Sequence, residues 1–232
     1  RGIINDKRDY ADARLLQEMC AGEPYGISRF GDEAGLAKIN NQKLYAHSQR
    51  MMSSSRLELF YCGSASLERV REALAAAFAT LPRDGIRDIA PSTPHPARTE
   101  VKRVEEAMDV SQGKLALGFR TGGVTCWEED YPALTMFNAV FGGTTLSKLF
   151  MNVREKLSLC YYASSMLEKM KGLVLVSSGI EFDKYQTAKD EILSQLEAIR
   201  RGEIQDWELE GARRTLIGGH LATLDDQGRQ EE

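Results

Sequence analysis

Residues 141–162 read FGGTTLSKLFMNVREKLSLCYY, and this run joins the end of one helix, a second helix and the start of a strand. The glycine pair Gly142-Gly143 ends the first helical pattern, and Thr144 or Thr145 can cap the helix that follows. Apolar residues then recur at helical spacing, at Leu146, Leu149, Phe150 and Val153.

The second half of this run connects a charged helix end to a strand. Arg154, Glu155 and Lys156 lie in the last helical turn, and the pattern becomes strand-like at residues 160–162. Arg154 and Tyr161 both carry hydrogen-bond donors on apolar stems, so they could converge on one concave spot and polarise a carbonyl. The alternative is structural: the arginine stabilises the helix macrodipole and the tyrosine fills the core.

The same run resembles the pitrilysin/insulinase-type zinc metallopeptidases (inverzincins), which include mitochondrial processing peptidase. Their second domain carries Gly-Gly, then Ser-x-Leu-Phe, then Arg-Glu-Lys-x-Gly-Leu-x-Tyr. The matching positions here are Gly142, Gly143, Ser147, Leu149, Phe150, Arg154, Glu155, Lys156, Leu159 and Tyr161. Ser158 stands where the family usually has glycine. The resemblance implies that Arg154 and Tyr161 bind substrate, and that Tyr161 is also catalytic, stabilising the oxyanion.

The zinc of that family is bound by a His-x-x-Glu-His helix and a later glutamate. His47, His95 and His220 are the only histidines in this sequence, and none has a second histidine four positions on. No metal site is therefore predicted from this chain, and each histidine is interpreted as unligated. The resemblance implies zinc in the full-length protein or its partner, and the chain alone is expected not to hydrolyse peptides.

Composition describes a soluble globular chain of 232 residues, 42% hydrophobic and 28% charged, enough for one large domain or two modest ones. A net charge of −4 argues against nucleic acid as a partner. No apolar run approaches the ~20 residues of a membrane span. Four scattered cysteines without a Cys-x-x-Cys pair favour isolated thiols and a reducing, cytoplasmic setting.

Periodicity along the chain predicts a mixed α+β fold, with an antiparallel sheet and helices on one face. Helices are expected over residues 8–20, 31–39, from 41, after Ser66, from 132, over 183–201 and from 206. Strands are expected over residues 56–62, 99–106, 113–119, 161–168 and 172–180, with a hairpin turn at 169–171. Glu18, Glu23, Asp225 and Asp226 are interpreted as solvated carboxylates.

The resemblance also implies a duplicated metallopeptidase-type domain, present here as partial copies. Residues 1–82 are expected to be the C-terminal half of the first domain, and 99–232 the N-terminal and middle part of the second. Residues 83–98, with Pro91, Pro94 and Pro96, form a linker between them. The incomplete halves should expose sheet edges and apolar surface, which favours self-association.

Two main functional hypotheses follow from the resemblance. The first is a fragment of an insulinase-type peptidase that contributes the substrate-binding half of the site, with a peptide as its partner. The second is a non-catalytic partner or scaffold subunit that pairs with a homologous active peptidase. A plain α+β binding domain, in which Arg154 and Tyr161 only pack, is a third alternative.

Overall fold

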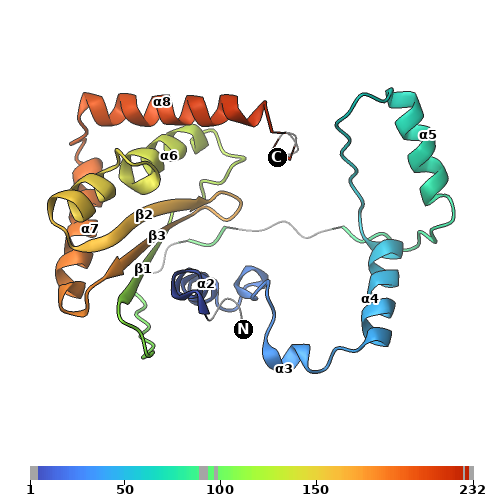
Figure 1. The fold of residues 1–232 in the computed structure, drawn as a ribbon, viewed down its shortest axis with the longest axis horizontal. Helices are drawn as coiled ribbons and strands as arrows, with labels where there is room; N and C mark the ends of the chain where they lie inside the picture. The colour runs from blue at the N-terminus through green and yellow to red at the C-terminus, as the bar shows by residue number, and fades with distance from the viewer. Residues whose placement is uncertain (1–4, 89–93, 97–98, 227, 230–232) are drawn as a thin grey trace. The chain divides into compact units, whose positions relative to one another are not determined.

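The computed structural model describes residues 5–88, 94–96, 99–226 and 228–229 (Figure 1). The chain divides into two compact units. Unit 1 comprises Arg1–Ser28 and Ser92–Leu221, and unit 2 comprises Arg29–Pro91 and Ala222–Glu232. The N-terminal 28 residues thus belong with the second half of the chain, although unit 2 follows them in the sequence.

Unit 1 is built on a three-stranded antiparallel sheet, as the sequence predicts. The strands are β1 (Gly113–Arg120), β2 (Cys160–Glu168) and β3 (Leu173–Ile180), in the order β1-β3-β2. β3 lies in the middle, and all of its residues are buried. Burial of every residue is typical of a strand covered on both faces. The predicted hairpin turn at residues 169–171 is confirmed.

Helical segments cover one face of this sheet. They are α6 (Tyr131–Asn138), the π-helical segments η2 (Ala139–Gly143) and η3 (Leu149–Lys156), η4 (Phe182–Lys184) and α7 (Tyr185–Arg200) (Figure 1). Their apolar side chains pack on alternate residues of the strands. The buried members of this core are Leu115, Phe141, Leu149, Val153, Leu159, Ala163, Val174, Val176, Ile180, Ala188 and Ile192.

The other face of the sheet is covered by α2 (Lys7–Met19) and the short 3₁₀ turn η1 (Pro24–Gly26). Cys20 packs there on Leu173 and Leu175, which alternate along β3 with the residues of the first core. The Asp6 carboxylate caps α2 by accepting from the amides of its first turn. The predicted layered α+β class is confirmed, and α2 adds a second covered face that the sequence pattern did not predict.

The last helix, α8 (Asp206–Thr223), is attached to the helical layer by a buried ion pair. The Nζ atom of Lys148 lies 3.0 and 2.9 Å from the two carboxylate oxygens of Glu208. Ala212 adds an apolar contact to Ala139 and Val140. Within the described residues, none of the helices combines the length and apolar character that crossing a membrane requires.

Unit 2 contains α3 (Glu33–Leu36), α4 (Asn41–Ser54) and α5 (Leu67–Phe78). None of these helices has a buried residue. The predicted strand over residues 56–62 is wrong for this structure, which has only an isolated bridge between Ser55 and Arg87 there. A strand forms by pairing, and in the described part of the chain this segment has no strand beside it.

The predicted strand over residues 99–106 is also absent. This segment is instead held to α2 by charged side chains. Lys102 pairs with Glu18 at 2.6 Å, and Glu106 accepts from Arg14 and from the Tyr10 hydroxyl, both at 2.7 Å. These side-chain contacts take the place of a backbone ladder. Residues 89–93 and 97–98 of the predicted linker lie outside the described residues, and the predicted domain boundaries stay predictions.

Candidate functional site

The candidate site begins at the turn between η3 and β2. Ser158 has a backbone φ of 48°, the left-handed conformation that favours glycine. Its amide donates to the Arg154 carbonyl at 3.1 Å, and the Leu159 amide donates to the Val153 carbonyl at 3.1 Å, which closes the helix end. The serine that replaces the usual glycine of the family thus adopts a left-handed backbone conformation here.

Tyr161 follows at an irregularity in the strand. Cys160 pairs with Ile180 and Tyr162 pairs with Gly179, so the pairing register shifts across Tyr161. A bulge of this kind leaves one residue unpaired and redirects its side chain, and bulges are common next to active sites. Tyr161 is 63% exposed. Its side chain therefore does not fill the core, and the packing interpretation fails for this residue.

Arg154 is linked to the same point of the strand. Its Nε donates to the main-chain carbonyl of Tyr161 at 2.9 Å. The guanidinium lies 4.6 Å from the centre of the Phe150 ring, and Nη1 lies 3.3 Å from a Glu155 carboxylate oxygen. The aromatic ring supports the guanidinium from one side. The structure therefore brings the Arg154 guanidinium to the backbone of Tyr161.

The surroundings of this pair are mixed in polarity. The Arg154 side chain is 39% exposed, so its charge faces water as well as protein. Beside it, burial raises the pKa of the Cys160 thiol, while a hydrogen bond with Ser178 and the positive charge of Arg154 oppose that rise. The arrangement offers a guanidinium and an exposed phenol, two donors that suit a carbonyl or carboxylate oxygen.

Among the described residues of this chain, the histidines do not gather into a zinc site. His47 lies on α4, His220 on α8, and His95 3.6 Å from the carboxylate of Glu23. In the part of the chain that the structure describes, no three His, Cys, Asp or Glu side chains form a group that could hold a metal. Zinc needs three or four such ligands around one point.

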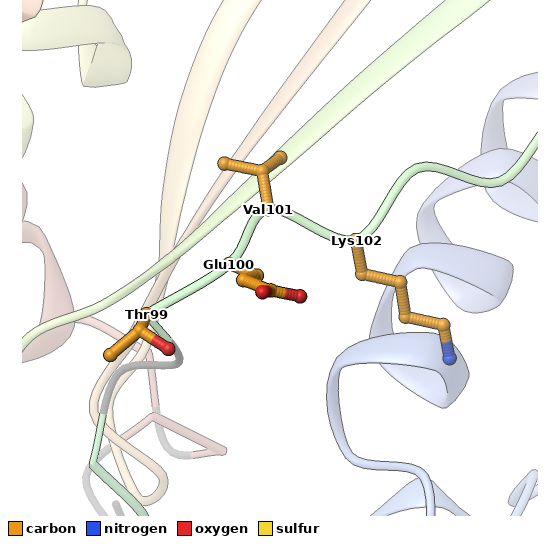
Figure 2. Close-up of a pocket in the computed structure, with 4 residues that line it drawn as sticks. All are labelled: Thr99, Glu100, Val101 and Lys102. Carbon is orange, nitrogen blue, oxygen red and sulfur yellow. The ribbon is translucent and has the colours of Figure 1, made fainter.

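A separate hollow lies at the start of the 99–106 segment, which is held to α2. Figure 2 shows the four residues that line it, Thr99, Glu100, Val101 and Lys102. All four come from one extended stretch. The Lys102 side chain reaches toward α2, where it pairs with Glu18 (Figure 2). Neither Arg154 nor Tyr161 lines this hollow, and its side chains point in different directions instead of converging on a ligand.

Comparison with known proteins shows the family of the chain. The model of a family described as "Peptidase M16 inactive domain" matches residues 38–216, more than half of the chain. The chain belongs to the peptidase M16 family. This confirms the resemblance drawn from residues 141–162.

Relatives of this M16 chain include the "Probable inactive metalloprotease YmfF" of Bacillus subtilis, 35% identical over 97% of the chain and 52% of that protein. A second B. subtilis relative, "Uncharacterized zinc protease YmxG", is 26% identical over 53% of the chain and 30% of that protein. The chain thus spans about half the length of the first relative, and its match to the second covers 30% of that protein.

Among solved structures, a conserved protein from Enterococcus faecalis matches with a TM-score of 0.87 and 31% identity, over 99% of the chain and 53% of that protein. The M16 inactive domain from Pseudomonas fluorescens matches with a TM-score of 0.72 and 21% identity, over 94% of the chain and 53% of that protein. The second likeness concerns the fold alone.

Two features of this M16 site were not predicted from the sequence. The first is the Phe150 ring beneath the Arg154 guanidinium. Its spacing of four residues on a helix was a usable signal, because side chains at i and i+4 are neighbours. The second is the bulge at Tyr161. It has no local signal, because a bulge is defined only by the partner strand.

Proposed function

We propose that this chain supplies the substrate-binding half of a peptide site in a longer M16 protein. Arg154 would hold a backbone carbonyl of an extended peptide, and Tyr161 would donate a hydrogen bond to the oxyanion that develops on the reacting carbonyl. The observation that carries the proposal is the 2.9 Å hydrogen bond from Arg154 Nε to the carbonyl of the exposed, bulged Tyr161.

The chemistry of these two groups suits such a role. A guanidinium offers several N–H donors in a fixed plane, and its stacking on Phe150 limits its motion. A phenol can donate one hydrogen bond to an oxygen that gains charge, which lowers the barrier of a reaction at that carbonyl. Zinc ligands and a general base would have to come from residues outside this chain, so the proposal concerns binding and polarisation only.

The test is made in the full-length protein. If that protein hydrolyses peptides, Tyr161→Phe should lower kcat by a factor of about 10²–10³ with a much smaller change in KM, as for the loss of one oxyanion donor. Tyr45→Phe is the matched control, because Tyr45 is a similarly exposed tyrosine, at 69%, on α4 of unit 2. Equal turnover in wild type and Tyr161→Phe would remove Tyr161 from the mechanism.

The second candidate function is that of a non-catalytic partner, favoured by the name of the relative that is 35% identical, a probable inactive metalloprotease. Under this second function, the protein would still bind peptides but would not hydrolyse them. The coding sequence upstream of Arg1 distinguishes the two, since a His-x-x-Glu-His motif favours the enzyme. Under either function, Arg154→Met should weaken binding of a labelled unstructured peptide about tenfold, as for a lost charged hydrogen bond. Unchanged affinity would contradict both.

A further inference from the structure

The attachment of α2 to the sheet is uneven along its length. None of the residues of α2 itself is buried, and Cys20, directly after the helix, is fully buried against Leu173 and Leu175. At the other end of α2, Arg8 donates a long hydrogen bond of 3.3 Å to Ser164 and lies over the Tyr162 ring. Full burial in this segment therefore occurs at its C-terminal end.

That end carries a buried carboxylate between two buried cations. The Glu23 carboxylate lies 2.9 Å from Arg120 Nη2 and 2.5 Å from Lys171 Nζ. The three side chains are 11%, 9% and 3% exposed. Glu23 was interpreted from the sequence as solvated, and this is wrong because the fold brings two cations to it from β1 and the β2–β3 turn. Arg120 also donates to the Met19 carbonyl at 2.7 Å, at the end of α2.

The turn that presents Glu23 is tightly constrained. Pro24, Tyr25 and Gly26 form η1, and a Cβ atom at Gly26 would collide with the carbonyl oxygen of Cys20. Lys171 lies 5.7 Å from the centre of the Tyr25 ring, so the same lysine contacts both the carboxylate and the turn. Only glycine allows the chain to fold back this closely, and the fold-back directs Glu23 toward the sheet.

The same carboxylate also meets the returning chain. Unit 1 is interrupted between Ser28 and Ser92 by the residues assigned to unit 2. Glu23 lies five residues before the departure point, and His95 lies just after the return. The His95 Nε2 atom is 3.6 Å from Glu23 Oε2. One carboxylate therefore contacts the sheet and both flanks of the insertion.

We propose that Glu23 is an electrostatic staple that holds the C-terminal end of α2, from which the 29–91 insertion departs, on the sheet of unit 1. When its charge is removed, Arg120 and Lys171 are left buried, close together and without the carboxylate that they share. Taking a shared carboxylate away from two buried cations is costly in a protein interior. The rearrangement that costs the least free energy separates the C-terminal end of α2 from the sheet. This exposes Cys20 while the core on the opposite face of the sheet stays packed.

Cysteine labelling measures this opening when rates are compared at several pH values. Burial and the charge of Glu23 both raise the pKa of the Cys20 thiol, so loss of that charge alone increases the thiolate fraction. Full-chain Glu23→Gln and wild type are pulsed with a thiol reagent, and the labelling of each cysteine is read by mass spectrometry. Cys20 should react at least about tenfold faster in Glu23→Gln, because it is protected only while α2 is docked. Cys160, whose pKa is also raised by burial but which packs on the opposite core, should keep its wild-type rate.

Glu18→Gln is the matched control. Glu18, on α2, is likewise a carboxylate that pairs with two cations, Arg14 and Lys102, but its side chain is 27% exposed. Its loss should leave Cys20 labelling within about twofold of wild type, as for a surface pair. Equal Cys20 rates in the two variants would overturn the proposal, as would equal acceleration of Cys20 and Cys160, which would indicate general unfolding.

A milder variant covers the case in which Glu23→Gln does not fold. Arg120→Lys keeps the positive charge but loses the Nη2 atom that donates to both Glu23 and the Met19 carbonyl. Cys20 labelling should accelerate by a smaller factor than in Glu23→Gln, again without a change at Cys160. A wild-type Cys20 rate in Arg120→Lys together with a folded protein would also overturn the staple.

Discussion

Ser158 carries a left-handed turn without the conformational freedom of glycine. Its φ of 48° costs an L-residue roughly 1 kcal/mol. Ser158→Gly removes that cost but adds freedom to the unfolded chain, which offsets part of the gain. We expect the free energy of unfolding to rise by up to about 1 kcal/mol, measured by urea denaturation at equilibrium.

The control for this substitution is Ser194→Gly, at an exposed position in the interior of α7. Glycine there should lower the free energy of unfolding by about 0.5 kcal/mol, because a helix interior gains nothing from left-handed freedom. Opposite signs at the two serines support the strain argument. A loss at Ser158 equal to that at Ser194 would show that the turn tolerates serine without cost.

Asp12 and Glu23 make the free energy of unfolding depend on pH with opposite signs. Burial raises the pKa of Asp12 above its ordinary value, although a hydrogen bond with Ser177 and the charge of Arg8 partly oppose this. Burial also acts on Glu23, but the hydrogen bonds from Lys171 and Arg120 outweigh it and lower the pKa of that carboxyl. Protonation of Asp12 therefore stabilises the fold, and protonation of Glu23 destabilises it.

We expect Asp12→Asn to be more stable than wild type at neutral pH. A raised folded-state pKa means that the contribution of Asp12 is fully present below the ordinary carboxyl pKa, about 3.9, and is lost as pH rises through the folded value. The advantage of the asparagine variant should therefore vanish in acid and grow toward neutrality. Urea midpoints measured across this range test the sign, and a constant difference at all pH values would contradict it.

At the scale of elements, the Lys148–Glu208 pair decides how α8 is attached. Both side chains are almost fully buried, at 7% and 4% exposure, and Glu208 also accepts from the Gln205 amide. Lys148→Met leaves a buried carboxylate without its cation, which should lower the free energy of unfolding by about 3–5 kcal/mol. The double variant Lys148→Met, Glu208→Leu should recover most of that loss, because no buried charge is then left.

The same helix provides the control for this prediction. Arg213 pairs with Glu210 on the exposed side of α8, with side chains 63% and 44% exposed. Arg213→Met should change the free energy of unfolding by less than about 1 kcal/mol. If Lys148→Met were equally mild in urea denaturation, the buried pair would have no special role in holding α8.

Elements with strong local signals were predictable from the sequence. The β2–β3 hairpin and α7 follow from alternation and from helical periodicity, and both are present. The expected strands at 56–62 and 99–106 have similar patterns but are not paired. An alternation of apolar residues indicates that a segment can form a strand. The strand forms only where a neighbouring strand is available for pairing.

The candidate site has a local signal in the sequence, and the Glu23 cluster does not. Arg154 and Tyr161 are seven positions apart, so a short motif could place them together. The Glu23 cluster joins residues 97 positions apart, and no pattern near Glu23 indicates that Arg120 will reach it. The sequence alone therefore described Glu23 as solvated, because its partners are assigned by the packing of α2 on the sheet.

Across the whole molecule, the two units use similar helix faces in different ways. α5 carries Leu67, Val70, Leu74 and Phe78, and α7 carries Tyr185, Ala188, Ile192 and Leu196, with the same spacing of three, four and four residues. The α7 stripe packs on the core of the sheet. The α5 stripe has no buried member, and Leu67 is 83% exposed. The same apolar spacing is thus buried on α7 and exposed on α5.

The exposed apolar stripe of α5 predicts that the isolated chain self-associates. Exposed apolar groups in unit 2 also include Leu44, Tyr45, Leu59 and Phe60, at 60%, 69%, 57% and 51%. Such a concentration of apolar surface favours association in water. Sedimentation velocity should show oligomers that grow with concentration, and Leu74→Asp should reduce them by placing a charge in the α5 stripe. A single monomer peak at high concentration in wild type would contradict this.

The matched substitution on α7 separates association from folding. Ile192 is fully buried at the position of its stripe that corresponds to Leu74, so Ile192→Asp places an unpaired carboxylate in the core and should unfold unit 1. Leu74→Asp should leave the near-ultraviolet circular dichroism and the urea midpoint of unit 1 unchanged, since no residue of α5 is buried. If Leu74→Asp were as damaging as Ile192→Asp, the α5 stripe would have to be packed against a core of its own in solution.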